Sequence, residues 1–122
     1  MKKLTIIGMF IVVAATGCYY DKEEELYGHN GACNTESVTY SVTVSGLLNS
    51  HGCLGCHAGP TPDGNINLQG HTNLAAVARS GKLYGSINHM PGFQPMPQGS
   101  NKMSSCDISR VKAWVDAGAP NN

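Results

Sequence analysis

The segment Cys53-Leu54-Gly55-Cys56-His57 decides how the rest of this sequence is interpreted. It separates two cysteines by two residues and places a histidine directly after the second cysteine. In a chain with five Cys and five His among 122 residues, chance produces this pattern roughly 0.008 times. Such an improbable segment indicates a specific chemical use for all three side chains.

The C-x-x-C-H pattern is the signature of covalent haem c attachment. Each thiol adds to one haem vinyl group, and two intervening residues let the chain bridge both vinyls in a tight turn. The histidine that follows, His57, then lies under the iron as its proximal ligand. Gly55 suits a close approach of the backbone to the ring. The segment therefore predicts one haem c, bound through Cys53 and Cys56.

Other chemistries also use a Cys-x-x-Cys pair. A thioredoxin-like redox pair is flanked by a βαβ pattern, and no such pattern surrounds residues 53–56. Half of a zinc site is a second alternative, but the sequence contains no further C-x-x-C pair. A third is a plain disulfide in a structural lipoprotein, with an incidental histidine.

The first residues have the features of an export signal. A basic start is followed by an apolar run from Leu4 to Ala15, which is shorter than the roughly 20 residues of a membrane-spanning helix. The run ends in Ala15-Thr16-Gly17-Cys18, which resembles a bacterial lipobox. That resemblance implies cleavage before Cys18 and lipidation of this cysteine. We therefore expect residues 1–17 to be a lipoprotein signal peptide, with an ordinary secretory peptide as the alternative.

The next residues are predicted to link this anchor to a single folded domain. Residues 18–32 include the acidic stretch Asp21-Lys22-Glu23-Glu24-Glu25 and show no apolar period, which favours a solvated tether. Residues 33–122 suffice for one small domain. Eight basic and eight acidic residues balance, so the chain lacks the basic excess of a nucleic-acid binder.

Two further cysteines, Cys33 and Cys106, flank the motif near the two ends of this domain. Export to an oxidising compartment makes disulfides possible, so we expect these two to be bonded. The bond would close a loop of roughly 70 residues and contribute about 4 kcal/mol to stability in the chain-entropy model. Two free thiols are the alternative.

A proline-rich segment, residues 89–99, supplies candidates for the sixth iron position. Its three prolines exclude a regular helix or strand and stiffen the loop. Met96 lies between two of them, and its soft thioether suits ferrous iron and raises the reduction potential. We expect Met96 to be the distal ligand. The alternatives are Met90, Met103, His89 and His71.

Further contacts are predicted around the haem. A carbonyl in the turn cluster Pro60–Gly64 is expected to accept the Nδ1–H of His57 and orient its ring. Ile66 and Leu68 are candidate pocket residues. His51, just before the motif, is a candidate for contact with a propionate.

Together these features resemble the monohaem class I cytochrome c domains, and most closely the small cytochrome-like domains of bacterial lipoproteins. The likeness covers residues 33–122 and rests on the attachment motif, on Met96-Pro97, and on the ending Trp114-Val115-Asp116-Ala117-Gly118-Ala119-Pro120. It implies an all-α, cytochrome c-like fold of a few short helices around one haem. It assigns attachment to Cys53 and Cys56, and iron ligation to His57 and Met96.

The resemblance also guides the expected helices. Val38 to Val44 alternate as in a strand, but the family places a helix directly before the motif, so we expect a helix over 39–50. A short helix over 74–79, capped by Asn73 and ended by Gly81, should follow. Another is expected around residues 83–87. The last should be capped by Ser105 or Asp107, bury Trp114 in the core, and end at Gly118.

The function expected from these features is electron transfer. The protein would be a membrane-anchored monohaem c-type cytochrome that passes single electrons between redox partners outside the cytoplasm, without being an enzyme. Its partners would be redox proteins that dock transiently, and it would be a monomer or a subunit of a respiratory-type complex. It would lie in the cell envelope, on the periplasmic face or the cell surface. The alternative is a peroxidase-like haem enzyme or small-ligand sensor with an open or labile sixth position.

Overall fold

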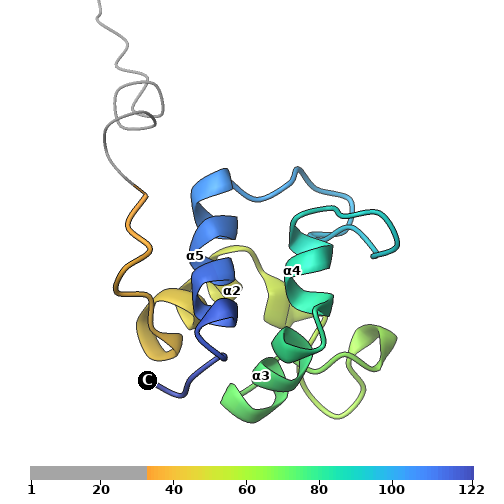
Figure 1. Ribbon diagram of the computed structural model, residues 1–122. Helices are drawn as coiled ribbons and strands as arrows, with labels where there is room; N and C mark the ends of the chain where they lie inside the picture. The colour runs from red at the N-terminus through yellow and green to blue at the C-terminus, as the bar shows by residue number, and fades with distance from the viewer. Residues whose placement is uncertain (1–32) are drawn as a thin grey trace, which may run out of the picture. The chain divides into compact units, whose positions relative to one another are not determined.

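The computed structural model describes residues 33–122, so the expected signal peptide, the lipidated Cys18 and the tether lie outside the described residues. The described part contains helices and no strands, and the predicted all-α class is confirmed. No helix within it has the length and apolar character needed to cross a membrane. In chain order the elements are η1 (Tyr40–Val44), α2 (Ser45–Ser50), η2 (Cys53–Gly55), η3 (Asp63–Asn65), α3 (His71–Arg79), α4 (Lys82–Ile87) and α5 (Ser105–Asp116) (Figure 1).

The helix expected before the motif is present, and it begins as a π-helical turn. Element η1 continues directly into α2, and the Thr39 side chain caps the first turn by accepting a hydrogen bond from the Val42 N–H. The alternation of apolar residues here does not mark a strand. Val42 is 75% exposed whereas Val44 is completely buried, as one face of a helix requires.

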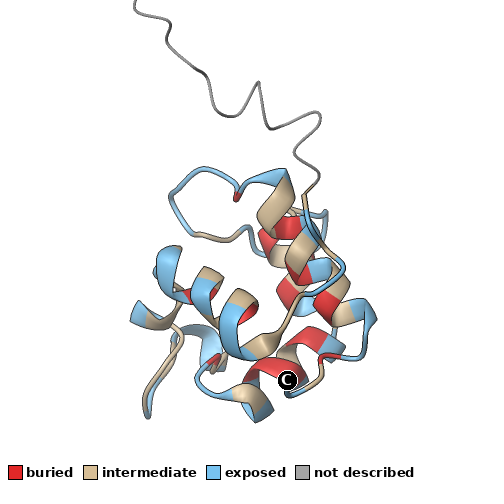
Figure 2. Ribbon diagram, turned by 90° about the vertical axis from the view of Figure 1, so that its left-hand side faces the viewer, coloured by how far each residue is buried: buried red, intermediate tan, exposed pale blue. Residues whose placement is uncertain are grey.

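The core forms where the helices face one another. Trp114, Leu74 and Val44 are the largest fully buried side chains, and they come from α5, α3 and η1. Figure 2 shows the buried positions on the inward sides of the helices. The Trp114 indole N–H donates to the carbonyl oxygen of Pro120 at 2.9 Å, so the buried ring keeps a partner for its polar atom. The expected core role of Trp114 is confirmed.

Two predicted helix caps were wrong. Helix α5 is capped by Ser104, whose hydroxyl accepts from the Asp107 N–H at 3.1 Å, rather than by Ser105 or Asp107. The Asp107 carboxylate instead pairs with His51 and Arg110. Helix α3 begins three residues earlier than expected, after Gly70. Asn73 therefore lies inside it, and its side-chain amide donates to the Gln69 carbonyl.

The predicted helix ends were right. Gly81 follows α3 and Gly118 follows α5, both with positive φ, and the short helix expected around residues 83–87 is α4. The chain beyond α5 is then held against the core. Arg79 donates to the carbonyl oxygens of Gly118 and Ala119, and His71 Nε2 donates to Ala119 at 3.0 Å. The His71 ring thus supports the C-terminal segment.

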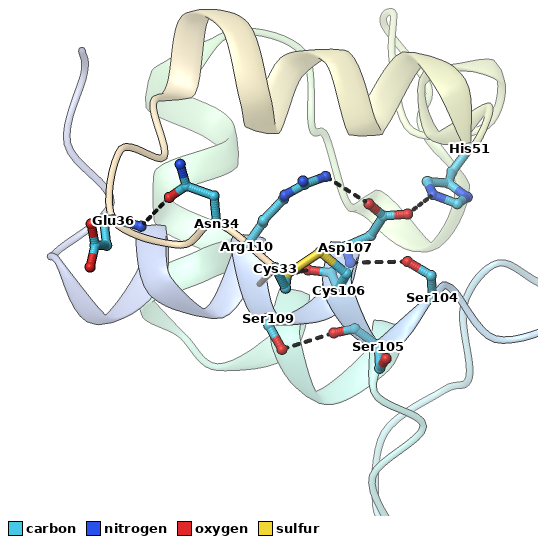
Figure 3. Close-up of a disulfide and its surroundings, with 10 residues drawn as sticks. All are labelled: Cys33, Asn34, Glu36, His51, Ser104, Ser105, Cys106, Asp107, Ser109 and Arg110. Atoms are coloured by element: carbon cyan, nitrogen blue, oxygen red, sulfur yellow. Dashed lines mark hydrogen bonds and ion pairs between the residues drawn. A yellow bond between two sulfur atoms is a disulfide. The ribbon is translucent and has the colours of Figure 1, made fainter. Parts of the chain in front are cut away.

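Cys33 and Cys106 lie at disulfide distance, with 2.06 Å between sulfur atoms and 5.4 Å between Cα atoms (Figure 3). The link joins the segment before η1 to the first turn of α5. The neighbouring Asp107 carboxylate lies between His51 Nε2 at 3.3 Å and an Arg110 nitrogen at 3.6 Å. Disulfide and ion pair together connect both ends of the η1–α2 segment to the start of α5.

Replacing both Cys33 and Cys106 with Ser should lower the free energy of unfolding by about 4 kcal/mol, because the unfolded chain regains the entropy of a long loop. Guanidinium unfolding of the exported protein, followed by circular dichroism, measures the change. A reductant should destabilise the wild type and leave the double variant unaffected. Equal unfolding midpoints for wild type and double variant would contradict the link.

Candidate functional site

A cavity of about 660 Å³ lies between the C-x-x-C-H segment and the wall formed by α4 and the proline-rich loop. This volume falls within the range of roughly 300–1,000 Å³ that is usual for sites of small molecules and cofactors. Its apolar lining comes from several elements and consists of Ile66, Val77, Leu83, Ile87 and Phe93. The four residues predicted to attach haem or to bind its iron also line it, namely Cys53, Cys56, His57 and Met96.

The first wall carries the two cysteines of the motif. Gly52, with φ +67°, ends α2 and turns the chain into η2, which begins at Cys53. Both thiols are free, Cys53 half-buried and Cys56 exposed. Burial raises the pKa of the Cys53 thiol above its usual value, although a backbone hydrogen bond opposes the shift. Cys53 therefore faces the cavity as a neutral thiol at neutral pH.

Three hydrogen bonds fix His57 in the same wall. Its N–H donates to the Cys53 carbonyl at 3.0 Å, and its carbonyl accepts from the Leu68 N–H at 2.7 Å. Its ring Nδ1 lies 3.0 Å from the carbonyl oxygen of Ile66. A carbonyl can only accept, so Nδ1 carries the proton and Nε2 keeps its lone pair for another partner. This is the arrangement of a histidine prepared to bind a metal.

The expected partner of His57 was wrong by two residues. We placed the accepting carbonyl within Pro60–Gly64, whereas it belongs to Ile66. The reason lies in the turn itself, because the Asp63 N–H folds back onto the Cys56 carbonyl at 2.9 Å. The chain comes alongside the histidine ring only after η3. Ile66 lines the cavity as expected, but Leu68 is buried in the core instead.

Only one of the residues predicted as candidates for the sixth iron position lies in the opposite wall of the cavity. Met96 lines the cavity, and its N–H donates to the Ser86 carbonyl at 3.0 Å. The four alternatives do not line it. Met90 is 39% exposed, Met103 is buried in the core, and the two histidines, His71 and His89, bond to backbone carbonyls.

Polar residues border the apolar lining. They are His51, Asp63, Lys82, Ser86, Gln94, Gln98 and Ser100. The ring of His51 is already paired with Asp107 through Nε2. Within residues 33–122, no three His, Cys, Asp or Glu side chains gather in a group that could hold a metal ion by themselves. The arrangement thus presents two thiols, one imidazole nitrogen and one thioether to a mostly apolar space.

Phe93 is a cavity residue that the sequence analysis did not identify. Its ring packs on α4 at Gly85, where a Cβ atom would lie only 2.6 Å from ring carbons. The signal in the sequence was the glycine itself, because a glycine inside a helical pattern often marks a close approach. Gly85 thus lets the proline-rich loop lie directly on the helix.

Comparison with known proteins gives no relative to guide the assignment. No protein-family model matches the chain, and neither a curated protein nor a solved structure shows detectable similarity to it.

Replacing Gly85 with Ala should destabilise the domain by about 1–3 kcal/mol, because the Phe93 ring must move away from the helix. Thermal unfolding measures the loss. Gly46→Ala in α2 is the matched control, since a Cβ there meets no atom within 4 Å and should be neutral or stabilising. A Gly85→Ala variant as stable as Gly46→Ala would show that Phe93 does not pack there.

Proposed function

We propose that residues 33–122 form a monohaem c-type cytochrome domain with a cytochrome c-like fold that carries single electrons. One observation carries the proposal: two thiols, the imidazole of His57 and the thioether of Met96, separated by up to 43 positions in the chain, line one cavity. The thiols match the two bonds of haem c attachment, and the other two groups match an axial ligand pair. Haem c supplies reversible one-electron chemistry at its iron when bound.

The residues of the first wall would hold and orient the group. Cys53 and Cys56 are the attachment sites; the first is half-buried at the start of η2, and the second is exposed directly after it. The hydrogen bond to Ile66 prevents rotation of the His57 ring and increases the electron density on Nε2. A ligand fixed in this way would change position little when the iron gains or loses an electron.

The residues of the second wall would control the chemistry of the iron. Met96 stands between two prolines, and its backbone N–H is bonded to α4. A thioether ligand favours the reduced state and raises the potential. The apolar lining excludes water, and a site without water disfavours the additional positive charge of oxidised iron. The lining would therefore also raise the reduction potential.

A partner would exchange electrons where the attachment segment reaches the surface. Cys56 is exposed, so the cavity edge beside it is open to solvent. The balanced charge of the chain does not favour strong electrostatic steering, which supports a small and mostly apolar docking area. Lipidation at Cys18 would keep the domain at the face of a bacterial membrane, outside the cytoplasm, where such encounters occur.

An optical spectrum of the exported chain, produced with haem c maturation machinery, tests the proposal. We expect covalent haem, sharp reduced bands, a Met–Fe(III) charge-transfer band and no response to carbon monoxide. Covalent haem that binds carbon monoxide readily would instead support the enzyme or sensor. Absence of covalent haem, with maturation verified on a control protein, would rule out the cytochrome.

Replacing Met96 with Ala should abolish the charge-transfer band and open the ferrous iron to carbon monoxide, because the thioether ligand is lost. The same spectra measure both effects. Met90→Ala is the matched control, since Met90 belongs to the same loop but is exposed and does not line the cavity. A Met96→Ala variant with an unaltered oxidised spectrum would remove Met96 from the ligand role.

A further inference from the structure

The four α-helices of the described part end with the same backbone conformation, but one of them does so at a residue that is not glycine. Each is followed, one position after its cap, by a residue in the left-handed region of backbone conformation. Three of these residues are glycines, at φ +67°, +80° and +91°, and the fourth is His89 at φ +54° after α4. The equivalent glycines are Gly52, Gly81 and Gly118.

The hydrogen bonds at the ends of α4 and α5 are equivalent. After α5, the N–H groups of Gly118 and Ala119 donate to Val115 and Trp114. After α4, the N–H of His89 donates to Ser86 at 3.2 Å and that of Met90 to Gly85 at 2.9 Å. Both ends form a Schellman motif, in which glycine is preferred because a Cβ is strained there. A histidine at this position therefore suggests that its side chain does something that glycine cannot.

The His89 side chain reaches the residue expected to bind iron. Its Nε2 donates to the carbonyl oxygen of Met96 at 2.9 Å, while the Met96 N–H donates to Ser86 at 3.0 Å. Both polar groups of the Met96 backbone are thus bonded to the end of α4. Rotation of this backbone is restricted, which limits the directions that the Met96 side chain can take.

We propose that His89 is a positioning residue that holds the Met96 thioether in the sixth position; the inference rests on the proposed function. His89 does not line the cavity, so it acts through the Met96 backbone and not by touching the iron. Its role would be to keep the ligand bound when thermal motion of the loop would release it. The backbone strain at His89 persists because this hydrogen bond cannot be made from a glycine.

Replacing His89 with Gly separates ligation from stability. The variant removes the hydrogen bond but relieves the left-handed strain. The Met96 thioether should then be displaced about fivefold to tenfold more readily, as expected for one lost hydrogen bond, so ferrous protein that does not respond to carbon monoxide in the wild type should begin to bind it. The Met–Fe(III) charge-transfer band should weaken in parallel. His89→Gln keeps an N–H donor at a similar reach and should restore both properties toward wild type.

His71→Ala is the matched control. His71 also donates to a backbone carbonyl at 3.0 Å, that of Ala119, but lies outside the cavity lining. This variant should lower the unfolding midpoint more than His89→Gly does, and leave carbon monoxide binding and the charge-transfer band unchanged. His71→Ala should thus lose more stability, and His89→Gly should lose more ligation of the iron by Met96. A purely structural role of His89 would not produce this difference.

The outcomes also distinguish this inference from the proposed function. If Met96→Ala loses the band while His89→Gly matches wild type in both readouts, the positioning role is overturned and the cytochrome assignment stands. If His71→Ala weakens ligation as much as His89→Gly, the effect is general destabilisation and the inference is again overturned. A wild type without covalent haem would overturn both.

Discussion

The hydrogen bond from His57 Nδ1 to the Ile66 carbonyl is the contact on which the candidate site depends. It decides which ring nitrogen carries a proton, and thereby which one is available to a ligand. It also closes residues 58–65 into a loop. Leu68 then lies beside the motif and is buried in the core, where it is 6% exposed. The orientation of one imidazole is thus held by the burial of a leucine eleven positions later.

The second wall of the cavity is built on the last turn of α4. Gly85 and Ser86 provide carbonyl oxygens for the chain that follows, and Gly85 also leaves room for the Phe93 ring. A loop with three prolines makes few regular hydrogen bonds of its own, so these contacts to a helix give it a defined shape. The two walls therefore obtain a defined shape in different ways. In the first wall the cysteines and His57 are close together in the chain, whereas the second wall is held by its contacts to the end of α4.

The sequence allowed prediction of what depends on residue type and spacing. The all-α class and the glycine ends at Gly81 and Gly118 belong here. Met96, predicted as the distal ligand, lines the cavity, whereas Met90 and Met103 do not. Contacts whose acceptor is a backbone carbonyl could not be predicted, because every residue offers the same group. Ile66 as the partner of His57 and Met96 as the partner of His89 are of this kind. The cap at Ser104 was missed because the adjacent Ser105 has the same capping propensity. The start of α3 after Gly70 was missed because Asn73, the better capping residue, lies inside the helix.

The position of the Cys33–Cys106 link has a mechanical consequence for the segment that it encloses. A stretching force applied to the chain before residue 33 reaches the crosslink first and is shared there between two paths. Part of the tension passes straight into the first turn of α5, and the covalent loop between the two cysteines cannot be drawn out. The C-x-x-C-H segment, both walls of the cavity and the proline-rich segment with Met96 all lie inside that loop. Tension applied from the N-terminal side is therefore carried by the crosslink, and the segment that lines the cavity is not extended.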